Sequence, residues 1–110
     1  FFDALRVEVA HLGLKVTTIV PGSIKTAVAH NALTGSGEAT GVADPNIEAG
    51  MDVQECAQFI ADAFEAGSEE IAVGEGPEMA LLDMKRQDPT GTFRALEQMA
   101  ADLIQVDDTQ

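Results

Sequence analysis

Only two short stretches of this sequence have the composition of a β-strand, and each follows a segment with helical periodicity. Residues Lys15 to Val20 read KVTTIV, where five of the six are β-branched, and residues Glu70 to Val73 read EIAV. Two strands do not form a self-sufficient sheet, and strands separated by helical crossovers pair in parallel. We therefore expect an α/β chain whose strands need further parallel partners, either from sequence outside these 110 residues or from another chain.

The N-terminal segment carries one apolar stripe at helical spacing. Phe1, Leu5, Val9 and Leu12 follow one another at intervals of four, four and three residues. Because further apolar residues lie off this stripe, we expect a helix over residues 1–12 that is buried on more than one side. The chain opens without Met and already in helical register, which indicates a piece of a longer protein.

The segment from residue 23 to residue 50 lacks apolar periodicity. Four of the ten glycines fall between Gly35 and Gly50. A stretch of this length inside a compact domain is typically a lid, a binding loop or a disordered segment, and the composition leaves these three alternatives open. Within it we expect short helical turns over residues 26–33.

A capped amphipathic helix is predicted from Asp52 onward. The Asp52 side chain is placed to accept hydrogen bonds from the first turn, Glu55 to reach back, and Met51 and Cys56 to form a hydrophobic staple. Gly67 closes the helix. Its expected apolar face consists of Val53, Cys56, Ala57, Ile60, Ala61 and Phe64.

Two more helices are expected after the second strand. A turn over residues 74–77 leads to a helix over residues 78–85. A final amphipathic helix over residues 92–106 follows the helix breakers Asp88, Pro89 and Gly91. The tail, residues 107–110, is expected to fray.

Charge and cysteine content exclude several classes of protein. Six Lys and Arg against 19 Asp and Glu give a net charge of −13, which repels phosphate backbones and anionic lipid. We therefore expect no nucleic-acid partner and no membrane partner. The single cysteine, Cys56, forms neither an internal disulfide nor a cysteine-based zinc site. With no signal peptide and no apolar run near the roughly 20 residues that span a bilayer, we expect a cytoplasmic protein.

No glycine-rich segment here completes a dinucleotide-binding motif. The glycines between Gly35 and Gly41 have no strand before them and a spacing one residue too long. Gly74 and Gly76 do follow a strand, but Met79 stands where the third glycine belongs, so a turn is the better interpretation.

The remaining candidates for catalysis or metal binding are also incomplete. His11 and His30 lack ligand partners at metal-binding spacing, and Cys56 lies on an apolar helix face as a core residue would. Ser23 is not in a G-x-S-x-G motif. Asp44, Asp52 and Glu55 can be interpreted as a carboxylate cluster, but helix capping explains Asp52 and Glu55. We expect no catalytic residue and no metal site in this chain.

The segment Val16 to Thr26 is the most informative for binding, because a strand runs directly into a small polar loop. Ligands of open parallel sheets bind beyond the carboxyl ends of the strands. Gly22 allows close approach of a ligand to the backbone, and Ser23 and Thr26 offer hydroxyl groups. The residues alone leave two interpretations open, a ligand-binding loop and a plain turn that ends a strand.

The order of these segments resembles the C-terminal part of a classical short-chain dehydrogenase/reductase. The resemblance runs to about Val73 and rests on the helix FFDALRVEVAHLGLKV, the strand and loop VTTIVPGSIKT, and the later helix MDVQECAQFIADAF. Its most specific element is P-G-x-[I/V]-x-T, at Pro21 to Thr26. The resemblance implies an incomplete Rossmann-like, doubly wound parallel sheet, and an NAD(P)-dependent oxidoreductase that interconverts an alcohol and a carbonyl.

The same resemblance assigns roles in binding NAD or NADP. Pro21, Gly22 and the backbone of Ile24 would lie at the nicotinamide end of the cofactor, and Thr26 would hydrogen-bond near the carboxamide or diphosphate. Residues 27–50 would form a mobile lid over a small-molecule alcohol or carbonyl substrate. The full-length enzyme is expected to be a homo-oligomer. This chain would be a single partial domain with segments at 1–26, 27–50, 51–85 and 86–110.

The family's catalytic groups are missing from these residues. The catalytic Ser and the Tyr-x-x-x-Lys pair lie upstream in the family, and this chain contains no Tyr. We therefore expect it to be inactive alone, and it also lacks the residue that selects NAD or NADP. One alternative is a non-catalytic oligomerisation or interaction module derived from the same fold. Another is a different doubly wound α/β enzyme with a similar Pro-Gly loop.

Overall fold

The computed structural model describes the backbone of residues 1–108 and the side chains of residues 1–104. The chain divides into two compact units, Phe1–Gly76 and Pro77–Gln110. The strands of the described residues all belong to the first unit. The single partial domain expected from the sequence stays a prediction.

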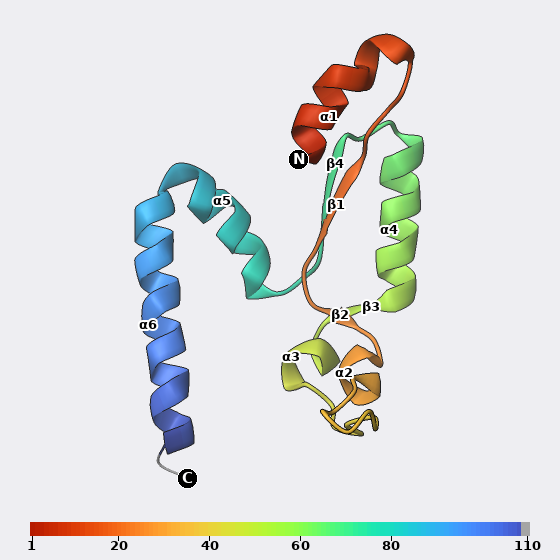
Figure 1. Cartoon of the computed structure of the whole chain (residues 1–110). Coiled ribbons are helices and arrows are strands. Elements are labelled where there is room, and N and C mark those ends of the chain that lie inside the picture. The colour runs from red at the N-terminus through yellow and green to blue at the C-terminus, as the bar shows by residue number, and fades with distance from the viewer. Residues whose placement is uncertain (109–110) are drawn as a thin grey trace. The chain divides into compact units, whose positions relative to one another are not determined.

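The centre of the first unit is a parallel pair of strands, β1 (Thr18–Pro21) and β4 (Glu70–Val73) (Figure 1). Thr18 lies opposite Glu70, and Pro21 lies opposite Val73. The Gly22 amide donates to the Val73 carbonyl at 2.8 Å. Both strand predictions are therefore confirmed, with β1 beginning three residues after Lys15 and including Pro21.

Pro21 fits in β1 because alternate residues of a strand bond to opposite sides. The amides of Thr18 and Gly22 donate toward β4, to Glu69 and Val73. Position 21 therefore faces the other edge of β1, where the missing N–H of proline costs no bond of this pair. In the described residues β4 is the one strand that pairs with β1.

The core of this unit is small and lies between β4 and α4 (Val53–Glu65). Ile71 and Val73 are 2% exposed, and Cys56 of α4 is 7% exposed. The Asp52 carboxylate caps α4 as predicted, accepting from the amides of Gln54 and Glu55. The helix ends at a left-handed Gly67, also as predicted.

Helix α1 (Phe2–Val9) continues into a 3-10 turn, η1 (Ala10–Leu12), and ends at Gly13 with φ 75°. The helix prediction is confirmed, but the expectation of burial on more than one side is wrong. No side chain of α1 is buried, and Phe1 is 92% exposed. The β1–β4 pair offers too little surface to cover a second face of this helix.

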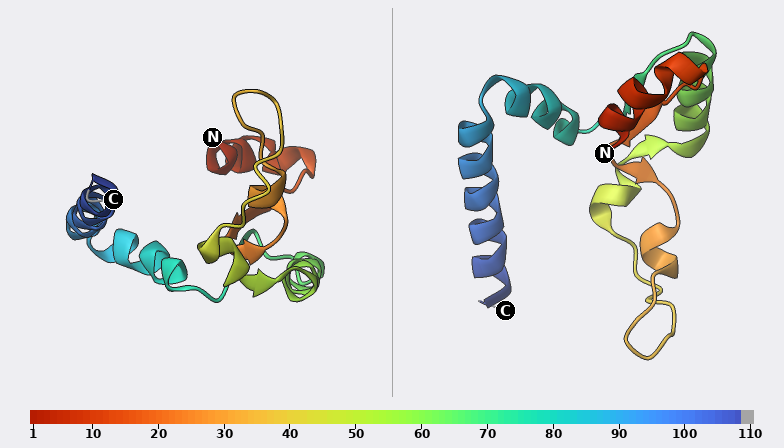
Figure 2. Two further views of the ribbon diagram at one scale, coloured as in Figure 1. Left: turned by 90° about the horizontal axis from the view of Figure 1, so that it is seen from below. Right: turned by 45° about the horizontal axis from the view of Figure 1, so that its top comes forward.

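The middle segment contains more structure than its composition indicates. It forms β2 (Ile24–Lys25), α2 (Val28–Asn31), an isolated antiparallel bridge between Leu33 and Ala39, and α3 (Pro45–Glu48). β2 pairs in parallel with β3 (Met51–Asp52). Figure 2 shows that the segment leaves the β1–β4 pair and returns at nearly the same place. The expected helical turn over 26–33 is confirmed as α2.

The second unit consists of a 3-10 turn η2 (Pro77–Met79), α5 (Ala80–Gln87) and α6 (Pro89–Asp108). As predicted, Asp88 precedes the last helix. The same prediction is wrong for Pro89 and Gly91, which lie in the first turn of α6. Asp88 caps α6 by accepting from the Gly91 amide at 2.9 Å, and proline is tolerated in a first turn because its N–H would be unpaired there. Gly91 leaves the room that the Asp88 carboxylate occupies.

Residues 107 and 108 of the expected frayed tail belong to α6, and residues 109–110 lie outside the described residues. Among the helices of residues 1–108, none combines the length and the apolar character needed to cross a bilayer.

Candidate functional site

The predicted binding residues occupy one continuous loop at the carboxyl end of the β1–β4 pair. Pro21 is the last residue of β1, and Gly22 continues the hydrogen-bond ladder to Val73. Gly74 and Gly76 follow β4 at the same end. This is the end at which parallel sheets bind ligands.

The backbone of Ile24 faces away from its neighbouring strand. Ile24 lies in register with Met51, and the Met51 amide donates to the Ser23 carbonyl at 2.9 Å. In a parallel pair, the two residues that flank Ile24 carry the bonds to Met51. The N–H and C=O of Ile24 therefore point to the side opposite β3.

Thr26 is exposed at the entrance to α2. Its Oγ1 accepts from the Val28 amide at 3.4 Å, a long hydrogen bond that uses an oxygen lone pair. The hydroxyl hydrogen remains able to donate to another group. Thr26 is thus positioned by the backbone while keeping its donor hydrogen and one oxygen lone pair for another partner.

Carboxylates that the sequence placed in a cluster serve as helix caps. Asp44 accepts from the Asn46 amide at 2.8 Å and Asp52 from the Gln54 amide at 2.9 Å. Glu55 contributes its amide to the Asp52 cap. His30 is exposed, with Nδ1 3.4 Å from the neighbouring Asn31 Oδ1. In residues 1–104, no group of three or more His, Cys, Asp or Glu side chains is placed to hold a metal ion.

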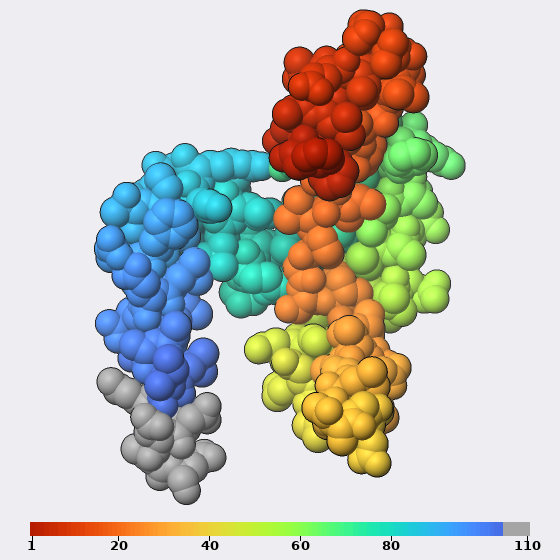
Figure 3. All heavy atoms as spheres, viewed as in Figure 1, coloured from red at the N-terminus to blue at the C-terminus, as the bar shows by residue number. Residues whose placement is uncertain are grey.

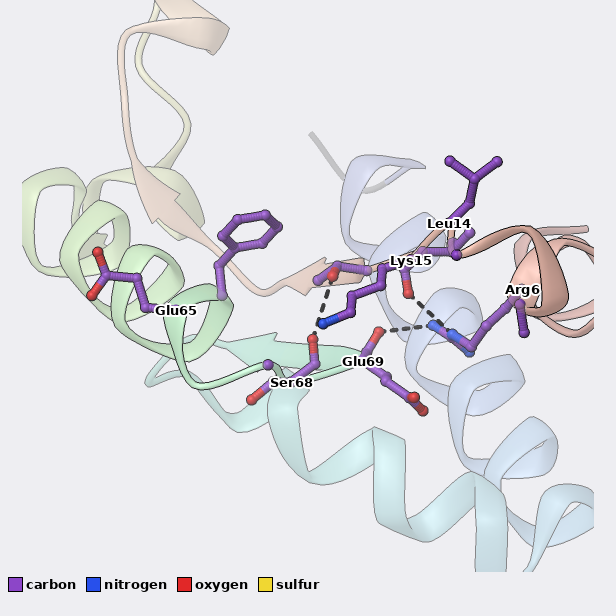
Figure 4. Close-up of a pocket in the computed structure, with 12 residues that line it drawn as sticks. Arg6, Leu14, Lys15, Glu65, Ser68 and Glu69 are labelled. Atoms are coloured by element: carbon purple, nitrogen blue, oxygen red, sulfur yellow. Dashed lines mark hydrogen bonds between the residues drawn. The ribbon is translucent and has the colours of Figure 1, made fainter.

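A cavity of about 670 Å³ lies at the opposite, amino-terminal end of the strand pair (Figure 4). Arg6 reaches into it from α1 and donates through Nε to the Val16 carbonyl at 3.0 Å. Another guanidinium nitrogen donates to the Glu69 carbonyl at 2.8 Å. The guanidinium thus ties α1 to the starts of β1 and β4, a structural role that its position on an amphipathic helix did not indicate.

Relatives of this chain come from one family. A Xenopus laevis protein named Dehydrogenase/reductase SDR family member 7B is 39% identical over 82 residues, which are 74% of this chain and 25% of that protein. An Anopheles gambiae protein named Dehydrogenase/reductase SDR family protein 7-like is 33% identical over 103 residues, 94% of this chain and 32% of that protein. The chain is homologous to short-chain dehydrogenase/reductase proteins. No protein-family model matches it, and no solved structure is significantly similar.

The short-chain dehydrogenase/reductase resemblance drawn from the sequence is thereby confirmed at the level of the family. Its α/β organisation with parallel strand pairs is compatible with part of a Rossmann-like fold. The chain spans about a quarter to a third of the length of these relatives. The match to the Anopheles protein extends beyond the residues that carried the resemblance in the sequence.

One residue that matters to the loop, Gly50, is not among those that the sequence singles out. A Cβ atom on Gly50 would overlap the Ser23 carbonyl oxygen and lie 2.9 Å from the Ile24 nitrogen. In the sequence, nothing distinguishes Gly50 from the other glycines of the middle segment. Its close approach to Ser23 depends on the fold, because the two residues lie far apart in the chain.

Proposed function

We propose that this chain supplies part of the nicotinamide pocket and the substrate lid of an NAD(P)-dependent oxidoreductase. The reaction would interconvert an alcohol and a carbonyl of a small molecule. The observation that carries the proposal is the direction of the Ile24 backbone, whose N–H and C=O point away from β3 at the carboxyl end of the strand pair. The homology to dehydrogenase/reductase proteins supports it.

The residues present fit the nicotinamide end of such a cofactor. A carboxamide carries one carbonyl acceptor and two N–H donors, which complement a backbone N–H, a backbone C=O and a hydroxyl group. Ile24 offers the first two and Thr26 offers the third. Gly22 presents no side chain that would keep the ring from the backbone. The cofactor would supply the hydride chemistry, and these residues would bind and orient its nicotinamide.

The proton-transfer groups of the reaction would come from outside these residues. The chain contains no Tyr, so it cannot provide the tyrosine that the family resemblance implies as proton donor or acceptor. Reading the coding sequence upstream of Phe1 tests this directly. We expect an in-frame Tyr-x-x-x-Lys there and an intact protein in the cell much larger than this chain.

We further propose that residues 27–50 cover the substrate. This segment forms α2, the Leu33–Ala39 bridge and α3. Its two ends meet at the β2–β3 pair, beside Ile24. A substrate bound near the nicotinamide would therefore lie against it. A cytoplasmic location, supported by the single, unpaired Cys56, and assembly into a homo-oligomer belong to the same proposal.

The test replaces Thr26 by Ala in the protein expressed from its complete coding sequence. Loss of one hydrogen bond, worth about 0.5 to 1.5 kcal/mol, should raise the KM for the nicotinamide cofactor about twofold to twelvefold. Thr17→Ala is the matched control, because its Oγ1 donates to the Ser68 carbonyl at 3.4 Å, at the amino-terminal end of the strand pair and away from this loop. Unchanged cofactor affinity and turnover in Thr26→Ala would contradict the assignment of Thr26.

Exposed apolar side chains favour a second candidate, the interaction module. Phe1 and Phe2 are 92% and 57% exposed, and their rings meet edge to face with centroids 5.0 Å apart. Apolar side chains exposed together mark surfaces that associate with other chains. Sedimentation of the native gene product with and without NADH and NADPH separates the two functions. A product of about this chain's mass that oligomerises and ignores both cofactors would favour the module.

A further inference from the structure

The middle segment is closed at its base by a short parallel pair. β2 and β3 pair Ile24 with Met51 and Lys25 with Asp52. The Met51 amide donates to the Ser23 carbonyl at 2.9 Å. This pairing brings the two ends of the segment together and sets the direction of the Ile24 backbone.

Gly50 is the point of closest approach in this base. A Cβ atom there would overlap the Ser23 carbonyl oxygen, lie 2.7 Å from the Ser23 carbonyl carbon and lie 2.9 Å from the Ile24 nitrogen. All three are backbone atoms, so no side-chain rotation relieves the overlap. The Gly50 amide also donates to the Ile47 carbonyl at 3.0 Å, which holds the residue at the end of α3. A side chain at position 50 therefore forces β2 and β3 apart.

Part of the segment is held by bonds that do not involve this base. The Thr40 hydroxyl donates to the Ala29 carbonyl at 2.7 Å, and the Gly41 amide donates to the His30 carbonyl at 3.0 Å. On the other side, the Gly22 amide is held by Val73. Separation of β2 from β3 would thus change the orientation of Ile24 while leaving both neighbouring structures in place.

We propose that Gly50 is a positioning residue that holds the base of the middle segment closed and aims the Ile24 backbone at the nicotinamide. The orientation of Ile24 toward the nicotinamide rests on the proposed function, whereas the closure of the base by Gly50 does not. Gly50 itself touches no ligand in this scheme, because it acts through Ser23 and Ile24.

The base is tested by hydrogen exchange of individual amides in the protein expressed from its complete coding sequence, comparing Gly50→Ala with the unsubstituted protein. We expect the Met51 amide to lose its protection, while the amides of Thr18 and Gly22 keep theirs because the β1–β4 pair is not affected. Gly35→Ala is the matched control, since a Cβ atom at Gly35 meets nothing within 4 Å. Retained protection of Met51 in Gly50→Ala would overturn the proposal.

A second variant is needed if every amide loses protection in Gly50→Ala, because that variant would then not be folded. Met51→Pro removes the N–H that donates to Ser23 without adding an atom at position 50. In that variant we expect the amides of Thr18 and Gly22 to stay protected. The Lys25 amide, which flanks Ile24 and bonds toward Met51 in this register, should exchange faster. Unchanged exchange of the Lys25 amide would show that the bond between Ser23 and Met51 does not hold the base, which overturns the proposal.

The positioning role is tested in the protein expressed from its complete coding sequence. Gly50→Ala should raise the KM for the nicotinamide cofactor several-fold, with a smaller change in kcat at saturating cofactor. Asp62→Ala, on the exposed surface of α4 and outside the middle segment, should leave both values unchanged. If Met51 loses protection but the cofactor KM stays constant, the role of Gly50 toward the nicotinamide is overturned. The result with Thr26→Ala then decides separately whether the loop binds the cofactor at all.

Discussion

At the residue scale, Arg6 shows how one long side chain holds together a unit with a small core. Its side chain is 21% exposed and donates to the carbonyls of Val16 and Glu69 and to the Asp3 carboxylate. The first two bonds join α1 to the starts of both strands of the β1–β4 pair. A lysine at this position has no planar fork with which to reach both carbonyls together.

We predict that Arg6→Met lowers the free energy of unfolding by about 1 to 3 kcal/mol, because two carbonyls lose a charged donor. Urea unfolding followed by circular dichroism measures this change. Arg94→Met is the control: Arg94 pairs with Glu97 on an exposed helix surface, and its loss should change the free energy by less than about 1 kcal/mol. Equal effects of the two substitutions would contradict the role given to Arg6.

At the element scale, α4 depends on its cap for a defined start. Replacing Asp52 by Ala leaves the amides of Gln54 and Glu55 without their acceptor and should cost about 1 kcal/mol of unfolding free energy. Asp62→Ala is a charge-matched control on the same helix, where the carboxylate accepts only from Gln58 in the part of the chain that the structure describes. Urea midpoints that shift equally in both variants would argue against a specific capping effect.

Elements with strong local signals could be predicted from the sequence, and elements decided by context could not. The strand at 70–73 and the capped start of α4 were predicted correctly, because alternation and an N-cap Asp are local signals. The start of α6 was predicted three residues late, because Pro89 and Gly91 usually break helices. The Asp88 cap makes both residues compatible with the first turn of α6.

The candidate site, too, could be predicted only in part from the sequence. The Pro-Gly loop was found because a β-branched run ends directly in it. The closure of the middle segment was not found, because the Ser23 to Met51 bond and the contact at Gly50 join residues that are distant in sequence. Exposed Phe1 and Leu12 show the converse limit: an apolar stripe predicts a helix but does not indicate which element covers the stripe.

At the scale of the whole molecule, the two-stranded β1–β4 sheet limits what these 110 residues can do by themselves. β1 carries a further edge, toward which Ile19 directs its backbone groups, and Ile19 is 44% exposed although its register partner Ile71 is buried. In the described residues, nothing pairs with that edge. The loop that would meet a nicotinamide is therefore present without the remainder of a sheet to complete the pocket.

We predict that the 110-residue chain alone does not oxidise NADH or NADPH with any carbonyl substrate, because no tyrosine is present to transfer the proton. The assay follows the near-ultraviolet absorbance of the reduced cofactor, with the protein expressed from its complete coding sequence as the positive control. Turnover by the isolated chain that Thr26→Ala weakens would show that these residues hold a complete active site. Turnover unaffected by Thr26→Ala would instead point to a contaminating enzyme, because the loop that meets the cofactor would have no part in the reaction.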